Sequence, residues 1–330
     1  MKKMLCLLLI LSFSLSLPAC ETADKELMGN YGACDSLVHN DVGAFIESDF
    51  APLASKAYIV DVDDSMLSTN YVFDTENTEW NGCCFVINLT DNTLKFGYRM
   101  LNKVYPASIT KLLTALITLK TCDMDEMVTI SDEVADLSRG SNAELEAGDQ
   151  ISVYNLLLCL LTVSANNVGV ALAEHISGSE EAFVELMNEE LKNIGCANTH
   201  FANAHGLHDT EHYTTPYDMY LVLQQCIKYD DFMEIMHVTK TDYEYRNAAG
   251  ETVSRELETT NAFKLGKYEL PEGITILAGK TGTTPNAGYC LMMEVENSVG
   301  NRYIVAVYHA ETEEKLYGKM YDLMTSYCME

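Results

Sequence analysis

Hydrophobic and polar residues follow two different periods along this chain, and the change of period predicts where strands give way to helices. β-Rich runs stand near both ends, whereas the middle third follows a helical period. The predicted strands occupy residues 57–62, 84–89, 94–98, 274–277, 289–295 and 303–308. A closing helix is predicted over 311–327. Strands on both sides of a helical middle predict one α/β unit, whose sheet is completed by the C-terminal strands, with a helical lobe at about 122–260 inserted.

Several helices in the middle third have clear signals at their ends. Ser179 is a predicted N-cap, with acidic residues in the first turn and Gly195 as the stop. The inward stripe of this helix is Phe183, Met187, Leu191 and Ile194. Thr215-Pro216-Tyr217-Asp218 repeats the start signal as a capping box with proline at the first helical position. Residues 153–163 are apolar on nearly every side, which predicts a buried helix.

The N-terminus has the layout of a bacterial export signal. Lys2 and Lys3 precede an apolar run at 5–17, which leads to Leu17-Pro18-Ala19-Cys20. Residues 1–19 are therefore predicted to be removed. A small residue before Cys20 resembles a lipobox, so we expect a lipid on this cysteine and a membrane-anchored protein at the cell surface, with simple secretion as the alternative. Residues 20–54 read as a tether and residues 55–330 as the folded domain.

Net charge and cysteine spacing exclude several classes of partner and site. The formal net charge is −28, or about −30 once Lys2 and Lys3 are removed, which disfavours nucleic acid and anionic lipid as partners. A covalent lipid would therefore have to supply any membrane attachment. The cysteines contain no Cys-x-x-Cys pair and match neither a zinc pattern nor a regular disulfide frame. Cys159 and Cys290 lie in apolar runs and read as small buried hydrophobes.

The first candidate chemistry lies in Pro106-Ala107-Ser108-Ile109-Thr110-Lys111, which runs directly into apolar residues at helical spacing. If a helix begins near Ser108, the spacing puts its hydroxyl and the Lys111 amine one turn apart on one face. A serine attacks only when a neighbour takes its proton, and a lysine can do so if burial or a second cation lowers its pKa. Taken alone, the pair could also be two polar residues facing water.

Two further motifs follow in order. Ser164-Ala165-Asn166 stands at a break between predicted helices, and Lys280-Thr281-Gly282 ends a predicted strand. Singly, the first could cap a helix and the second could be an ordinary strand end. Ser-x-x-Lys, Ser-x-Asn and Lys-Thr-Gly in this order are, however, the set found in penicillin-binding proteins and serine β-lactamases. The ordered triple therefore indicates acyl transfer through a serine.

The resemblance extends beyond the triple. It rests on Pro106–Lys111, Ala171-Leu172-Ala173-Glu174-His175, Phe201-Ala202-Asn203-Ala204-His205-Gly206-Leu207, and Gly279–Gly282 followed by Ala287-Gly288-Tyr289-Cys290. These segments resemble the low-molecular-weight D-alanyl-D-alanine carboxypeptidases, over roughly residue 84 to the C-terminus. The resemblance implies a β-lactamase/transpeptidase-like fold, an antiparallel sheet with packed helices and an inserted all-helical lobe. It also implies no cofactor and no metal.

The resemblance assigns roles in acylation. Ser108 would attack the carbonyl between the two D-alanines of a peptidoglycan stem peptide, and Lys111 would take its proton, with Lys280 opposite lowering the pKa of Lys111. Ser164 would relay a proton to the leaving amine. Asn166 would bind the substrate amide and help to seat Lys111.

The remaining roles concern substrate binding. The backbone N–H groups of Ser108 and Thr283 would form the oxyanion hole. Lys280, with the hydroxyl of Thr281 or Thr283, would receive the terminal carboxylate. Gly282 would let the substrate backbone lie close to the strand. β-Lactams would act as inhibitors by acylating Ser108.

Three alternatives stay open. A class A β-lactamase also needs a glutamate that activates water, and Glu189 is available. Glu189, however, lies about 200° around its helix from Met187, so it is expected to point away from the inward stripe. The central triplet is also Ser-Ala-Asn rather than Ser-Asp-Asn. The other two alternatives are a metal site at His205, His208 and His212, and a non-catalytic cell-wall binding protein of the same fold.

Overall fold

The structure is a computed structural model that describes residues 80–329. The predicted export signal, Cys20, the tether and the predicted strand at 57–62 lie outside the described residues. Of the helices within the described part, none is both long enough and apolar enough to cross a bilayer.

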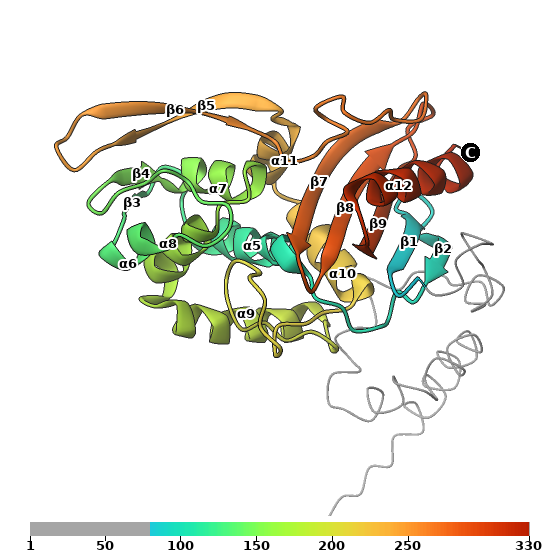
Figure 1. Cartoon of the computed structure of the whole chain (residues 1–330), viewed down its shortest axis with the longest axis horizontal. Coiled ribbons are helices and arrows are strands. Elements are labelled where there is room, and N and C mark those ends of the chain that lie inside the picture. Colours follow the sequence, from blue (N-terminus) through green and yellow to red (C-terminus); the bar gives the residue numbers. More distant parts are fainter. Residues whose placement is uncertain (1–79, 330) are drawn as a thin grey trace, which may run out of the picture. The chain divides into compact units, whose positions relative to one another are not determined.

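A five-stranded antiparallel sheet has the order β2-β1-β9-β8-β7. Its strands are β1 (Cys83–Asn88), β2 (Thr93–Tyr98), β7 (Thr275–Thr284), β8 (Gly288–Glu296) and β9 (Arg302–Ala310). The pairing of β1 with β9 joins the first described strand to the last (Figure 1). The predicted antiparallel sheet completed by C-terminal strands is therefore confirmed.

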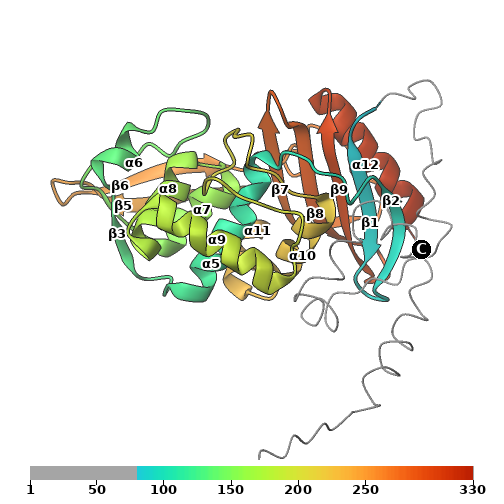
Figure 2. The same cartoon turned by 90° about the horizontal axis from the view of Figure 1, so that it is seen from below.

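Helices cover both faces of this sheet, which explains why every residue of β1 is buried. Alternate residues of a strand point to opposite faces. Phe85 contacts Tyr220 of α10 (Pro216–Cys226) edge to face, with ring centroids 6.1 Å apart. Val86, on the other face, belongs to the core under α12 (Glu313–Tyr327), which includes Met320. Figures 1 and 2 show α12 and α10 on opposite sides of the strands.

The inserted lobe contains most of the helices and also a second sheet. Its helices after α5 (Lys111–Thr121) are α6 (Asp132–Asp136), α7 (Val153–Thr162), α8 (Asn166–Ser177), α9 (Glu180–Ile194), α10 and α11 (Asp230–His237). The strands β3 (Met127–Thr129), β4 (Gln150–Ser152), β5 (Lys240–Arg246) and β6 (Thr252–Glu258) form a four-stranded sheet in that order. The prediction that the lobe is all-helical is therefore wrong in this detail.

The β5–β6 hairpin shows why the second sheet escapes notice in the sequence. Only Tyr243 and Tyr245 are buried in β5, and only Leu257 in β6. Charged residues occupy most of the exposed positions, so the strands lack the dense apolar run that the other predicted strands share. The hairpin appears in Figure 1 as a long ribbon above α7.

The predicted helix ends are confirmed where the signals are local. The Ser179 hydroxyl accepts a hydrogen bond from Ala182 N, and Gly195 ends α9 with a φ of 96°. Thr215 caps α10 by accepting from Asp218 N, with Pro216 at the first turn. The predicted stripe of α9 is buried, as is most of α7. These caps fix both ends of α9 and the start of α10.

Candidate active site

Ser108 lies in a short 3-10 segment, η2 (Ala107–Thr110), that runs directly into α5. Ala107 has a φ of 48°, a left-handed conformation that a non-glycine residue rarely adopts. The Thr110 hydroxyl donates to the Ala107 carbonyl at 2.8 Å and helps to hold this bend. The Lys111 Nζ is 3.0 Å from the Ser108 Oγ, so the predicted pair is within hydrogen-bonding distance.

Lys111 is fully buried and has two more partners besides Ser108. Its Nζ donates to the Asn166 Oδ1 at 2.7 Å and to the His205 carbonyl at 2.5 Å. Burial, together with the positive charge of Lys280, lowers the pKa of Lys111 well below its usual value. Lys111 can therefore adopt the neutral amine form that a general base requires.

Lys280 is the second buried cation and faces Ser164. Its Nζ donates to the Ser164 Oγ and to the Thr281 carbonyl, both at 2.9 Å. Burial lowers the pKa of Lys280 to about 7. A carboxylate bound beside Lys280 would favour its protonated form.

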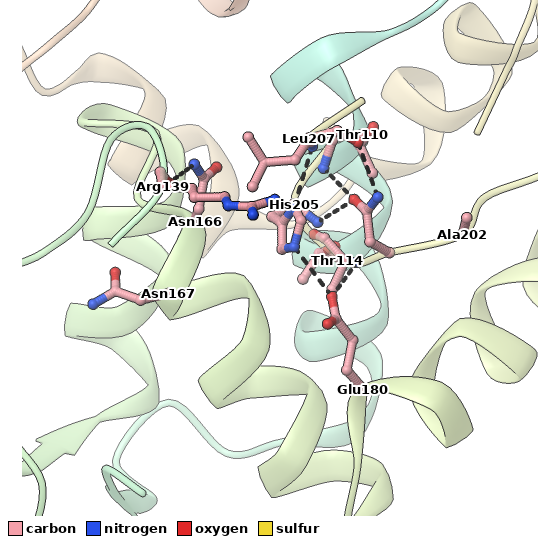
Figure 3. A network of polar contacts seen from close by, with 12 residues as sticks. Thr110, Thr114, Arg139, Asn166, Asn167, Glu180, Ala202, His205 and Leu207 are labelled. Carbon is pink, nitrogen blue, oxygen red and sulfur yellow. Dashed lines mark hydrogen bonds and ion pairs between the residues drawn. The ribbon is translucent and has the colours of Figure 1, made fainter. Parts of the chain in front are cut away.

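Ser164 and Asn166 come from the sharp turn between α7 and α8. Ser164 has a φ of 63°, and only 6% of it is exposed. The N-cap of α8 is Ala165, which has no side-chain capping bond, so the alternative that Ser164 and Asn166 merely cap the helix is wrong. Asn166 instead joins Lys111 to the Arg139 carbonyl, to which its Nδ2 donates at 2.9 Å (Figure 3).

The Lys-Thr-Gly motif lies inside β7, which is the edge strand of the sheet, rather than at the end of a strand. A Cβ added at Gly282 would lie 2.9 Å from the Pro106 carbonyl oxygen and 3.0 Å from the Ser108 N. The β7 backbone therefore runs directly beside the nucleophile. Thr283, the next residue, is exposed, and the Thr281 hydroxyl is 2.6 Å from the Thr260 hydroxyl.

Known proteins resemble this chain in sequence and in fold. The sequence profile of the family described as D-alanyl-D-alanine carboxypeptidase, Peptidase S11, matches residues 98–312. The chain belongs to this family.

Individual relatives carry the same family name. The chain is 34% identical over 220 residues to "D-alanyl-D-alanine carboxypeptidase DacF" of Bacillus subtilis, covering 64% of this chain and 53% of the relative. It is 32% identical over 210 residues to "D-alanyl-D-alanine carboxypeptidase DacA" of Haemophilus influenzae, covering 62% and 50%. The chain thus spans about half the length of these curated relatives.

A solved structure shares the fold. The Streptomyces K15 DD-transpeptidase superposes with a TM-score of 0.68 at 23% identity, covering 73% of this chain and 94% of the other. At this level of identity the likeness concerns the arrangement of sheets and helices, and it agrees with the antiparallel sheet and packed helices described above.

The three histidines considered as metal ligands have other roles in this member of the Peptidase S11 family. The His212 Nδ1 accepts from Ala202 N at 3.0 Å, and its Nε2 is 2.7 Å from the Thr110 Oγ1, so this ring supports η2. The His208 ring packs edge to face against Tyr105. Within residues 80–329, the group of potential ligand atoms that lie within 4.8 Å of one another is Cys122, Glu126 and His175, which includes none of the three.

His205 and Glu180 are site residues whose role the sequence did not reveal. The His205 Nδ1 accepts from Leu207 N at 3.1 Å, and its Nε2 lies 3.5 Å from the Glu180 Oε1. Burial and the nearby Lys111 lower the pKa of His205 to about 3, so the ring is neutral at physiological pH. The signal that could have found His205 is its place in the Asn203–Leu207 segment, which resembles the family.

Two remaining sequence predictions concern Glu189 and the cysteines. Glu189 is exposed on α9, as its angle from the buried stripe predicted. Cys159 and Cys290 are buried, which confirms the interpretation of them as small hydrophobes. The cysteines of the described part, including Cys83 and Cys84, are free thiols.

Proposed function

We propose that this protein is a serine D-Ala-D-Ala carboxypeptidase that removes the terminal D-alanine from peptidoglycan stem peptides through an acyl-enzyme on Ser108. The observation that carries the proposal is the contact between the Ser108 Oγ and a buried Lys111 whose pKa is lowered. A serine beside a neutral amine has a base available at neutral pH, which an isolated serine lacks.

Acylation would proceed in two stages. Lys111 takes the Ser108 proton as the Oγ attacks the carbonyl between the two D-alanines, and the resulting oxyanion accepts hydrogen bonds from the N–H groups of Ser108 and Thr283. The C–N bond then breaks, and Ser164 would relay to the departing D-alanine amine the proton that Lys111 took, which leaves Lys111 neutral again. Water later hydrolyses the ester and restores Ser108.

The terminal carboxylate of the stem peptide would be recognised by Lys280 and its neighbours. Lys280, with the Thr281 or Thr283 hydroxyl, supplies a positive charge and a donor for it. The contact between Lys280 and Ser164 supports this assignment, because a carboxylate bound by Lys280 would lie near the group that would protonate the leaving amine. Asn166 would hold the substrate amide while it seats Lys111.

A β-lactam would enter the same site and acylate Ser108, but its hydrolysis would be slow. Exposed Glu189 offers no buried base for a deacylating water. β-Lactams are therefore proposed as inhibitors rather than as substrates. A relative named "D-alanyl-D-alanine endopeptidase", from Escherichia coli, is 26% identical over 215 residues, so cleavage of cross-linked peptides belongs in the assay.

We also propose that the protein is exported and carries a lipid on Cys20. The support is the signal-like sequence before this cysteine. Cells expressing the full chain and grown with an alkyne-tagged fatty acid should label the wild type and not Cys20→Ala. Release of wild-type protein into the medium without label would favour secretion.

Fluorescent penicillin tests the central proposal. The wild type should form one covalent adduct per chain, Ser108→Ala should form none, and the wild type should release D-alanine from an N-acylated L-Lys-D-Ala-D-Ala peptide. A wild type that never labels would support the non-catalytic alternative, and many turnovers of penicillin per enzyme would support a β-lactamase.

A further inference from the structure

A neutral lysine amine has two hydrogens and one lone pair, so a lysine that acts as a base must be oriented as well as deprotonated. Lys111 has three oxygen neighbours: the Ser108 hydroxyl, the Asn166 Oδ1 and the His205 carbonyl. Only the hydroxyl can donate a hydrogen bond. If the other two oxygens take both amine hydrogens, the lone pair is left facing Ser108.

The Asn166 oxygen is fixed as an acceptor. Its amide nitrogen donates to the Arg139 carbonyl at 2.9 Å, so the oxygen end of the side chain faces Lys111. The backbone N–H of Asn166 also donates to the Ser141 carbonyl at 2.7 Å. Asn166, whose side chain supplies one of the two acceptors, is therefore held in place by the backbone carbonyls of Arg139 and Ser141.

The His205 carbonyl is held from the other direction by Glu180, at the start of α9. The Glu180 Oε1 accepts from the Ala204 N–H at 2.9 Å and lies 3.5 Å from the His205 Nε2. Because the His205 Nδ1 already accepts from Leu207 N, the ring proton is on Nε2 and points at Glu180. Figure 3 shows Glu180 reaching toward His205 from below.

We propose that Glu180 is a positioning residue for the general base: it clamps the Ala204–His205 segment so that the His205 carbonyl takes one Lys111 hydrogen and the lone pair points at Ser108. The inference rests on the proposed function, because it concerns the same proton transfer. Glu180 acts through an oxygen that accepts hydrogen bonds, and its charge is not required.

Four variants separate the effect of the length of the Glu180 side chain from the effect of its charge. Glu180→Gln keeps an oxygen at the same length and loses the charge. Glu180→Asp keeps the charge but shortens the side chain by one methylene, and Glu180→Ala removes both. Glu181→Ala is the matched control, because Glu181 occupies the same first turn of α9 and is exposed.

The assay is the second-order rate of acylation by fluorescent penicillin, with kcat and KM for the acylated Lys-D-Ala-D-Ala peptide, all measured on the full chain. A misplacement of about 1 Å can reduce a rate about 100-fold. Glu180→Ala and Glu180→Asp should acylate about 10 to 100 times more slowly, mainly through kcat. Glu180→Gln and Glu181→Ala should stay within about threefold of wild type.

Thermal unfolding and the comparison of variants keep the possible outcomes separate. Thermal unfolding of each variant shows whether the fold persists, and the Asp and Gln variants test the proposal even if Glu180→Ala does not fold. A Gln variant as slow as the Asp variant, or an Asp variant as fast as wild type, would overturn the positioning role. A wild type that is not acylated at all would instead overturn the proposed function.

Discussion

Strand β7 passes so close to η2 that position 282 has no room for a side chain. A Cβ there would lie 2.9 Å from the Pro106 carbonyl oxygen, 3.0 Å from the Ser108 N and 3.1 Å from the Ala107 Cβ. All three atoms belong to the segment that carries the nucleophile, and two of them are backbone. Gly282→Ala must therefore push η2 and β7 apart.

The size of the effect follows from these distances. Ordinary contacts with a Cβ begin at about 3.4 Å, so the two segments must separate by about half an ångström. Removal of one oxyanion donor reduces a rate about 100- to 1,000-fold, and a misplacement of about 1 Å about 100-fold. We expect Gly282→Ala to be acylated about 10 to 100 times more slowly, with about 1–3 kcal/mol of lost stability from overpacking.

Gly279→Ala provides the control on the same strand. Its Cβ would lie 2.9 Å from the Met293 Cγ and 3.3 Å from the Asn261 Nδ2, so this variant also crowds its surroundings but does not press on the segment that carries the nucleophile. The assay is the second-order rate of acylation by fluorescent penicillin, with urea unfolding of both variants. Gly279→Ala should stay within about threefold of wild type. If Gly282→Ala is also acylated within threefold of wild type, the tight approach of β7 to Ser108 does not position the oxyanion hole.

Three further predictions concern charge and capping. Lys280→Met removes the cation that helps to lower the pKa of Lys111, so the acid limb of the acylation rate should move to higher pH, as a pH profile would show. His212 has a pKa lowered to about 3, chiefly by burial. The unfolded chain gains a proton on it below about pH 6.5 while the folded chain does not, so its contribution to stability is present above that pH and lost as pH falls. Urea unfolding between pH 6.5 and 4.5 should show a slope shallower by up to about 1.4 kcal/mol per pH unit in His212→Gln. Ser179→Ala should cost about 1 kcal/mol in the same assay, because the cap of α9 is lost.

Local sequence signals predicted the parts of this protein that depend on local physics. The cap at Ser179 and the stop at Gly195 need only a few neighbouring residues, and the structure confirms both. The central sheet was predictable because β1, β8 and β9 are buried along most of their length and read as apolar runs. The β5–β6 hairpin was missed because most of its residues are exposed.

The sequence predicted which side chains form the site, but it could not predict which backbone groups contact them. The ordered motifs named Ser108, Lys111 and Lys280, since their chemistry is carried by residue type. The His205 carbonyl could not be found in this way, because every residue has one and only the fold decides which faces Lys111. Glu180 was predicted as an acidic first-turn residue, and its contact with the Ala204 N–H depends on how the 203–207 loop folds back.

The pairing of β1 with β9 also sets an order of events during synthesis. Ser108 and Lys111 leave the ribosome about 170 residues before Lys280, which is about 10–30 s at ordinary elongation rates. Until β7, β8 and β9 emerge, β1 can pair with β2 but lacks β9, and Lys111 lacks the second cation that helps to lower its pKa. A chain that ends before β7 therefore carries the nucleophile without Lys280 and without the strand that lies beside Ser108. The topology of the sheet therefore makes the arrival of β7 the step that completes the site around Ser108.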